Sequence, residues 1–398
     1  MSSRKLFSIA ATVMMSAAAL TGCATAKTSS NSGNSSSGST LKIGLNLELS
    51  GSVASYGQQE KKGAQLAAEQ INKAGGVKIG NKKYKVKLIT TDNKSATATA
   101  ASVAAQLANN QKVVAEVGPA ATAYATASIA NVTKAGVPMI SPSATAAGFT
   151  QTKSGSTQKY AFRACFIDSF QGKKAADFIY NTLKKKNVAI LEDNSTDYGT
   201  GLNKAFTAEY KKLGGKIVTT QSFQSGDKDF NSAITSIKSK KPAALYVPGY
   251  YAEIGLILKQ AREAGLNVPI VGGDGMGSPK LAQIAGKKNA TNVYYTTHFS
   301  TKSTDKRVVN FLKAYKNKFG EDPATFTSLA YDSVYMITKA AQNEGSTSSS
   351  AIQKGLANLK NFKGVTGTIT MDSKHNPQKS VVVEQMTNGT VTKAYTVK

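Results

Sequence analysis

Histidine and cysteine are scarce in this sequence, and their scarcity argues against several kinds of active site. Only two of each occur among 398 residues, and neither His298 nor His375 has a cysteine or acid pattern beside it for metal or triad chemistry. The GxSxG, CxxC, HExxH, GxxxxGKS/T and strand-linked GxGxxG motifs are absent. We therefore expect no enzyme activity, no cofactor and no metal, and we interpret His298 as a structural or hinge residue.

Long apolar runs are also absent after the N-terminal segment. No later run approaches the roughly 20 apolar residues that a membrane-spanning helix needs. Hydrophobic residues make up 40% of the chain and charged residues 18%. We therefore expect a soluble, globular body, and its length favours two domains.

The first forty residues have the pattern of a processing signal. Arg4 and Lys5 precede an apolar stretch at 6–20, and the tetrapeptide Leu-Thr-Gly-Cys ends at Cys23. This arrangement resembles the lipobox of bacterial lipoproteins, which implies cleavage before Cys23 and a lipid on its thiol. We predict a lipoprotein signal peptide at 1–22 and a tether rich in Ser, Gly and Asn at 23–40. An ordinary signal peptide with an incidental cysteine is the alternative.

Lipidation of Cys23 would leave Cys165 without a partner, so no disulfide can form within one chain. Cys165 lies among alternating apolar residues in YAFRACFID, and we predict a buried structural thiol there. The folded body must then depend on its hydrophobic core.

Acidic residues are few relative to basic ones, 23 against 50, which gives a formal net charge of +27. On an anchored, exported protein this charge suits an anionic lipid surface or polyanionic wall polymers. Nucleic acid is the rival partner, but the lysines are scattered and form no stripe interleaved with aromatic residues. Export also separates the protein from most nucleic acid, so we expect no nucleic-acid partner.

From Leu41 onward, apolar strand-like runs alternate with helical stretches. Strands at 41–49 and 84–92 alternate with helices at 58–72 and 96–107, and a second series of the same kind begins at 186. This alternation predicts an α/β fold with parallel sheets and right-handed crossovers, arranged as two lobes. The elements after residue 297 are too few for a third core, so we expect them to return and complete the lobes.

Ligands of open parallel sheets bind beyond the carboxyl ends of the strands, so the residues after each strand are the candidate site. Those residues are Tyr56, Thr122, Ser143, Ala144 and Thr145 in the first series, and Tyr198, Tyr250 and Asp274 in the second. Capping and turn chemistry can explain each loop alone, most clearly at Thr122, which directly precedes a helix.

Taken together, the loops after the strands offer three kinds of binding group, and the two strand–helix series supply different ones. Hydroxyls beside a helix N-terminus suit a carboxylate. Asp274, among glycines that let the backbone approach closely, suits a cation, and tyrosines supply apolar walls. A small zwitterion fits all three, with capping alone as the alternative.

Several segments, in the same order, resemble the signatures of the type I periplasmic binding proteins that serve branched-chain amino acid transporters. They are SGSVASYGQQEKKGAQLAAEQINKAGG, VPMISPSATA, DYGTGL, GDKDFNSAI, YVPGYYAEIGLILKQAREAG and GGDG. The resemblance implies two doubly wound, Rossmann-like lobes joined by three crossovers, which close on a ligand by bending at a hinge. It places lobe 1 at 41–164 plus 297–365 and lobe 2 at 165–296 plus 366–398.

The resemblance also implies roles for the candidate residues. The carboxylate-binding positions fall on Thr122, Ser143 and Thr145, partly through backbone N–H groups, and the acid that holds the α-ammonium falls on Asp274. The pocket walls fall on Tyr56, Tyr198 and Tyr250. The implied ligand is an aliphatic L-amino acid such as leucine, isoleucine or valine. The implied partners of the monomer are an ABC permease and, through lipidated Cys23, the extracytoplasmic face of the membrane.

Two further alternatives remain open. A receptor of the same fold could bind an amide, urea or an aromatic acid, or could signal to a sensor partner. Asp274 favours an amino acid over these ligands, because a ligand without an ammonium group does not need that carboxylate. A basic adhesin that holds anionic wall polymer would account for the charge but not for the ordered loop residues.

We predict that the mature protein begins at Cys23 and carries lipid on its thiol, because the apolar segment ends in a lipobox-like tetrapeptide. Intact-mass spectrometry of protein extracted from membranes should give the mass of residues 23–398 plus a diacylglyceryl group. The variant Cys23→Ala, as a control, should lack the added mass. A free Cys23 thiol in the mature protein would contradict the prediction.

Overall fold

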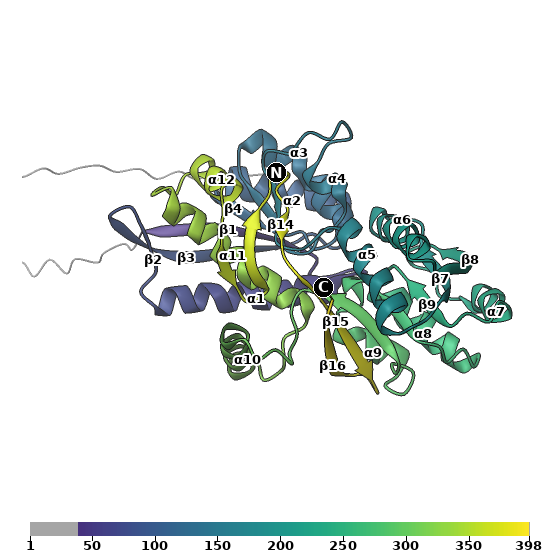
Figure 1. The fold of residues 1–398 in the computed structure, drawn as a ribbon. Coiled ribbons are helices and arrows are strands. Elements are labelled where there is room, and N and C mark those ends of the chain that lie inside the picture. Colours follow the sequence, from purple (N-terminus) through teal and green to yellow (C-terminus); the bar gives the residue numbers. More distant parts are fainter. Residues whose placement is uncertain (1–38, 398) are drawn as a thin grey trace, which may run out of the picture. The chain divides into compact units, whose positions relative to one another are not determined.

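A computed structural model describes residues 39–397 of the chain (Figure 1). The predicted signal peptide at 1–22, Cys23 and most of the predicted tether lie outside the described residues. Within the described part, strands and helices alternate, and the strands form two mainly parallel sheets and one small antiparallel sheet. The α/β class expected from the sequence is confirmed.

The first sheet has six strands in the order β2-β3-β1-β4-β5-β6. Their bounds are β1 (Thr40–Leu47), β2 (Val77–Ile79), β3 (Lys82–Asp92), β4 (Ala115–Val117), β5 (Met139–Ser141) and β6 (Ala161–Arg163). All neighbours are parallel except β2 and β3. Because β1 pairs with β3 on one side and β4 on the other, a crevice is expected outside the carboxyl ends of β1 and β4.

Helices from both ends of the chain cover this sheet. They are α1 (Ala54–Lys73), α2 (Thr97–Ala105) with its π-helical continuation η1 (Gln106–Asn110), α3 (Thr122–Ala135), α4 (Ala147–Thr150), α10 (Lys306–Phe319), α11 (Thr325–Asn343) and α12 (Ser349–Ala357). Helix α1 packs against α11, far away in the sequence, and α2 packs against α3 (Figure 1). As predicted, α1 stops before Gly75 and Gly76, whose φ angles are +95° and +91°.

The second sheet has seven strands in the order β16-β15-β11-β10-β9-β7-β8. Their bounds are β7 (Asn187–Asp193), β8 (Lys216–Phe223), β9 (Ala244–Val247), β10 (Ile270–Gly272), β11 (Val293–Thr297), β15 (Val381–Thr387) and β16 (Thr390–Val397). Strands β7 to β11 are parallel, and β15 and β16 are antiparallel additions. Asn388 and Gly389 form the turn between β15 and β16, with φ angles of +49° and +73°, as an Asn-Gly hairpin turn requires.

The helices of the second sheet are α5 (Asp168–Asp177) with η2 (Phe178–Thr182), α6 (Asp197–Lys212), α7 (Asn231–Ser239), α8 (Tyr251–Glu263), the 3-10 turn η3 (Asp274–Met276) and α9 (Pro279–Ala285). Helix α9 begins with a capping serine and a proline: the Ser278 side chain accepts from the N–H of Lys280, and Pro279 is at the first position. The sequence did not predict α5, because its buried face includes Asp168, Gln171 and Gly172 and so lacks apolar periodicity.

Both faces of the second sheet are covered. Ala189 and Leu191 of β7 face one hydrophobic cluster, while Val188 and Ile190 face another, and all four are fully buried. A strand buried on both faces is typical of doubly wound sheets, and it explains why the central strands are apolar throughout.

The chain passes between the layers of the two sheets three times. Strand β6 leads into α5, β11 leads back to α10 and α11, and a small sheet of β12 (Phe362–Gly364), β13 (Gly367–Met371) and β14 (Pro377–Gln378) precedes β15. The small sheet contacts the first layer, since the Thr150 hydroxyl donates to the side-chain oxygen of Asn376 at 3.1 Å. The exact lobe limits named above remain a proposal.

The tight packing of α1 on α11 gives a stability prediction. A Cβ added at Gly63 would lie 2.0 Å from the carbonyl oxygen of Thr327, a backbone atom that cannot move without shifting α11. Gly63→Ala should therefore lower the free energy of unfolding by about 1 to 3 kcal/mol, as overpacking does. Urea unfolding measures the difference.

The matched control is Gly148→Ala in α4, where the added Cβ would meet nothing within 4 Å. That variant should be neutral or slightly stabilising, because alanine favours helix over glycine. Equal stability of the two variants would contradict the predicted helix contact.

Candidate functional site

A narrow cavity lies beyond the carboxyl ends of the strands of both sheets. It is lined by Tyr56, Ala120, Ala121, Thr122, Ser143, Tyr198, Tyr250, Asp274, Gly275 and Phe326. Six of the eight candidate ligand-binding residues line this cavity, and Ala144 and Thr145 do not. The crevice outside the carboxyl ends of β1 and β4 and the crevice outside those of β7 and β9 thus contribute to one cavity.

A helix N-terminus forms part of the wall on the side of the first sheet. Thr122 is the first residue of α3, and Ala121 at the cap position supplies no side-chain hydrogen bond. The first N–H groups of an α-helix have no partner within the helix, so this end attracts an anion. The Thr122 hydroxyl accepts weakly from the N–H of Ala146 at 3.4 Å, so it serves the neighbouring loop instead of capping its own helix.

The hydroxyl of Ser143 points away from solvent into the first lobe. It lies 2.7 Å from Oε1 of Glu60 and 3.0 Å from the carbonyl oxygen of Ala120, both acceptors for its single proton. The hydroxyl is therefore used inside the protein, which leaves the backbone of Ser143 as the group that can face a ligand.

Ala144 and Thr145 shape the loop behind the cavity. The N–H of Ala144 donates to the Ser141 hydroxyl, and its carbonyl accepts from Nη1 of the buried Arg163 at 2.8 Å. The Thr145 carbonyl accepts from the N–H of Asp168, while its buried hydroxyl has no hydrogen-bond partner among the described residues. Arg163, which the sequence reasoning missed, also donates to Ala146 and so fixes the loop that carries Ser143.

Asp274 forms the acidic part of the opposite wall. It begins η3 directly after β10 and is only 1% exposed. Its Oδ1 accepts from the Tyr198 hydroxyl at 2.8 Å, and its Oδ2 lies 2.9 Å from Nε2 of His298. The N–H of Asp274 donates to Oε1 of Gln171 at 2.6 Å, so side chains from three other elements hold this carboxylate in place.

His298 does not line the cavity, but it supports the site through its hydrogen bond to Asp274. Burial lowers the pKa of His298 to about 4, so the imidazole is neutral at pH 7. An ionised carboxylate only accepts, so Nε2 must carry the proton and donate to Asp274. Its position after β11, the neighbour of β10, was the available signal, because the same strand-end rule applies there.

A second acid, Asp168, was missed as well. It is the first residue of α5, is 4% exposed, and neither of its carboxylate oxygens has a hydrogen-bond partner among the described residues. Burial, reinforced by the charge of Asp274, raises the pKa of Asp168 to about 8. It follows β6 closely, so the strand-end rule would have found it too.

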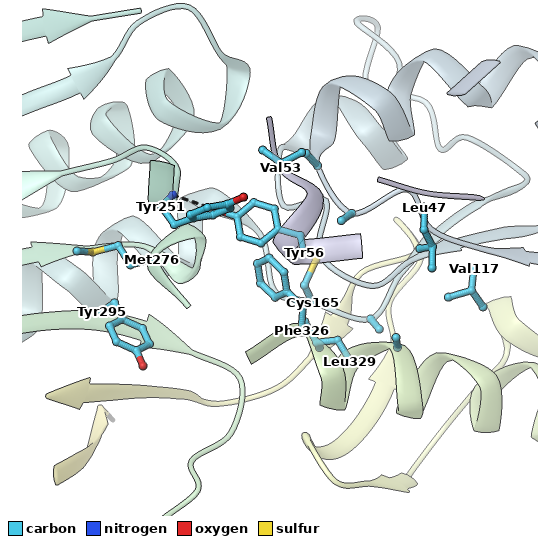
Figure 2. Close-up of a cluster of buried hydrophobic side chains, with 14 of the residues drawn as sticks. Leu47, Val53, Tyr56, Val117, Cys165, Tyr251, Met276, Tyr295, Phe326 and Leu329 are labelled. Carbon is cyan, nitrogen blue, oxygen red and sulfur yellow. Dashed lines mark hydrogen bonds between the residues drawn. The ribbon is translucent and has the colours of Figure 1, made fainter. Parts of the chain in front are cut away.

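Aromatic side chains form the remaining walls. Tyr198 and Tyr250 stack with centroids 5.0 Å apart, and Tyr56 meets Tyr250 edge-on at 5.8 Å and Phe326 at 4.8 Å. Figure 2 shows Tyr56 between Phe326 and Tyr251, with the N–H of Tyr251 directed at the Tyr56 hydroxyl. Such surfaces suit an aliphatic chain.

Tyr56 also joins the two sides of the cavity. Its hydroxyl donates to the carbonyl of Gly275 at 2.5 Å, and the neighbouring Ser55 hydroxyl lies 2.7 Å from that of Ser278. A residue of α1 is thereby bonded to the loop that carries Asp274. A larger cavity adjoins the first and shares Ala121, Thr122, Tyr198 and Tyr250 with it.

Residues 39–397 contain no helix long and apolar enough to cross a membrane. The same part of the chain contains no group of histidine, cysteine or acidic residues arranged to hold a metal ion. Cys165 is buried and unpaired, and burial raises the pKa of its thiol to about 12, as expected of a structural cysteine.

The sequence matches the family model for periplasmic binding proteins over residues 40–390. The leucine-, isoleucine-, valine-, threonine- and alanine-binding protein of Pseudomonas aeruginosa is 31% identical over 84% of this chain and 86% of that protein. Leu/Ile/Val-binding protein homolog 3 of Brucella melitensis is 34% identical over 83% of this chain and 86% of that protein.

Solved structures agree with this match. The branched-chain amino acid transporter substrate-binding protein LivJ of Streptococcus pneumoniae, in complex with isoleucine, is 45% identical with a TM-score of 0.84. The leucine-binding protein LivK of Thermotoga maritima is 32% identical with a TM-score of 0.82, and both comparisons cover 90% of this chain and 99% of the other. The chain belongs to the periplasmic binding protein family, a family of solute-binding proteins, and the predicted family resemblance is confirmed.

The neutral state of His298 predicts how acid affects stability. An unfolded histidine binds a proton near pH 6.5, but the folded site resists protonation down to about pH 4, so the unfolded state gains protons first as the pH falls. This contribution is fully present above pH 6.5 and is lost towards pH 4, by about 3 kcal/mol at most. His298→Gln keeps a donor near the position of Nε2 but cannot be protonated.

Urea unfolding of both proteins between pH 4 and 8 measures the effect. The wild type should lose stability relative to His298→Gln as the pH falls, while the difference stays constant between pH 7 and 8. If the free energies of unfolding of the two proteins differed by the same amount at every pH from 4 to 8, His298 would not be buried in the neutral form.

Proposed function

We propose that this protein captures a branched-chain L-amino acid between its two lobes and delivers it to an ABC permease. The observation that carries the proposal is the position of Asp274, which lines the same cavity as the uncapped N-terminus of α3. One wall therefore suits an ammonium group and the other a carboxylate. A free amino acid carries both.

Asp274 is the proposed partner of the α-ammonium. Tyr198 and His298 together supply two donors to its carboxylate, which has about four lone-pair sites. The free sites can accept from an ammonium group inside a cavity that excludes most water, where such a bond is strongest. Asp168 is a second buried acid near this end, and an ammonium group in the cavity would favour its charged form.

The α3 N-terminus and the 143–145 loop are the proposed carboxylate site. Thr122 and Ser143 line the cavity, and none of the described residues that line it is cationic. A carboxylate bound by backbone N–H groups and a helix dipole needs no arginine or lysine. Thr145 supports this loop from behind, through its carbonyl bond to α5.

The aromatic walls favour an apolar ligand side chain. Tyr56, Tyr250 and Phe326 line the cavity, and their rings offer an apolar surface that suits an aliphatic group. The relatives support the same assignment, because isoleucine is bound in the LivJ structure and branched-chain amino acids are named for the two curated relatives.

Delivery requires that the ligand change the balance between open and closed lobes. Bonds such as Tyr56 to Gly275 join the two sides of the cavity in this structure. A ligand that contacts both walls binds the closed state more tightly and shifts the population towards it. We infer that closure presents both lobes to the permease, and that the protein acts as a monomer without enzyme activity.

We place the protein on the extracytoplasmic face of the membrane, anchored through lipid on Cys23. The lipobox-like tetrapeptide supports this location, and so does the family, whose members act outside the cytoplasmic membrane. The serine-rich segment that follows would then act as a tether.

Isothermal titration calorimetry of residues 39–398 against the amino acids tests the proposed ligand. Leucine, isoleucine or valine should bind most tightly. Asp274→Asn should weaken leucine binding at least about thirtyfold, because removing one partner of a desolvated charge pair costs about 2 kcal/mol or more of binding free energy. The control Asp322→Asn, an exposed aspartate paired with Lys316, should bind like the wild type.

The absence of heat with every amino acid would overturn the proposal. Unchanged leucine affinity in Asp274→Asn would place the ammonium group elsewhere. Such a result, with tight binding of a carboxylic acid that lacks the ammonium, would favour a receptor of the same fold for another ligand.

A further inference from the structure

Two buried glutamates lie directly behind the carboxylate-recognising wall. Glu48 follows β1 and is fully buried, and its carboxylate accepts from the N–H groups of Ala120 and Ala121 at 3.0 to 3.1 Å. Glu60 of α1 is also fully buried and accepts from the Ser143 hydroxyl at 2.7 Å. Each glutamate thus holds one of the two loops that line the cavity.

The geometry places the same three groups between the glutamates and the ligand. Ala120, Ala121 and Ser143 line the cavity on one side and hydrogen-bond the two carboxyl groups on the other. A ligand carboxylate at this wall is therefore about one peptide group away from Glu48. Two negative charges at that separation, with little water between them, repel strongly.

Among the described residues, no cation compensates the charge of Glu48. Its bonding partners are backbone N–H groups and Asn93, and the ionisable groups that face it are Glu60 from α1 and Tyr124 from α3. Burial raises the pKa of Glu48 to about 7. Burial, reinforced by the charge of Glu48, raises the pKa of Glu60 well above its ordinary value.

We propose that Glu48 and Glu60 are positioning residues of the carboxylate-recognising wall, and that this pair takes up a proton when the ligand's carboxylate binds. The inference rests on the proposed function, because it needs an anionic group in the cavity. Proton uptake removes the repulsion between the ligand and Glu48. The bonds from Ala120 and Ala121 to the remaining carbonyl oxygen of the acid keep the loop in place.

The sign and size of the effect follow from linkage. A like charge at this distance raises the pKa of Glu48 by about one unit, so about 0.4 proton is taken up at pH 7. Binding that takes up protons weakens as the pH rises. The contribution of Glu48 should lower the leucine affinity about sevenfold between pH 6 and 8.5.

The other end of the ligand has the opposite effect. The ammonium group favours the charged form of Asp168, whose pKa is about 8 in the free protein, so its binding releases protons. The total proton exchange is therefore a difference between two contributions. Comparison of matched variants isolates the contribution of Glu48.

The test is calorimetric titration with leucine at pH 7 in buffers of different ionisation enthalpy, which counts the protons exchanged. Glu48→Gln should exchange about 0.4 fewer protons in the direction of uptake than the wild type, and should bind leucine more weakly because its amide disturbs the Ala120 and Ala121 bonds. The matched control is Glu116→Gln in β4. Glu116 is also fully buried, but neither of its oxygens bonds to any described residue.

Equal proton exchange in wild type and Glu48→Gln, with leucine still bound, would overturn this inference alone. No leucine binding by the wild type would instead overturn the proposed function.

Should Glu48→Gln fail to fold, carboxyl-carbon NMR of wild-type protein labelled only at glutamate gives the same answer. The resonance that titrates near pH 7 in the free protein should titrate about one unit higher with leucine bound. An unshifted resonance would overturn the inference.

Discussion

A carboxylate buried to 1% exposure must be hydrogen-bonded, and much of the second lobe is arranged to meet this demand at Asp274. Tyr198 comes from α6, His298 follows β11, and Gln171 comes from α5, so three separate segments converge on one acid. The same loop then accepts from Tyr56 of α1 through Gly275. Asp274, the proposed partner of the ligand's ammonium group, thus lies in the loop where the two sides of the cavity meet.

The first lobe meets the opposite demand, for a site that attracts an anion, without a cationic side chain. It supplies a helix N-terminus and loop backbone, and it supports them with buried acids in place of bases. Such a wall needs no charged side chain on its surface, but its support depends on pH because burial raises the pKa of Glu48 to about 7. The positive net charge of the chain therefore has no counterpart in the cavity and belongs to the exposed surface.

Most of the fold could be predicted from the sequence, because each strand is apolar and each helix repeats its apolar residues at helical spacing. Helix α5 was missed, since its buried residues Asp168 and Gln171 are polar and serve the site instead of the core. Six of the predicted site residues line one cavity, since the carboxyl ends of parallel strands must share an edge. The residues behind them, Glu48, Glu60 and Arg163, gave no pattern in the sequence because they act through single bonds to distant loops.

The sequence by itself determined the family, most of the order of strands and helices, and which loops line a shared cavity, because these depend on local patterning and on short motifs. Only the tertiary structure decided that the Ser143 hydroxyl turns inward to Glu60, that His298 holds Asp274, and that Asp168 has no partner. These contacts join residues between 24 and 83 positions apart, or leave a group unpaired. These contacts form only when the layers pack against each other. The sequence near each residue does not specify the rotamer of its side chain.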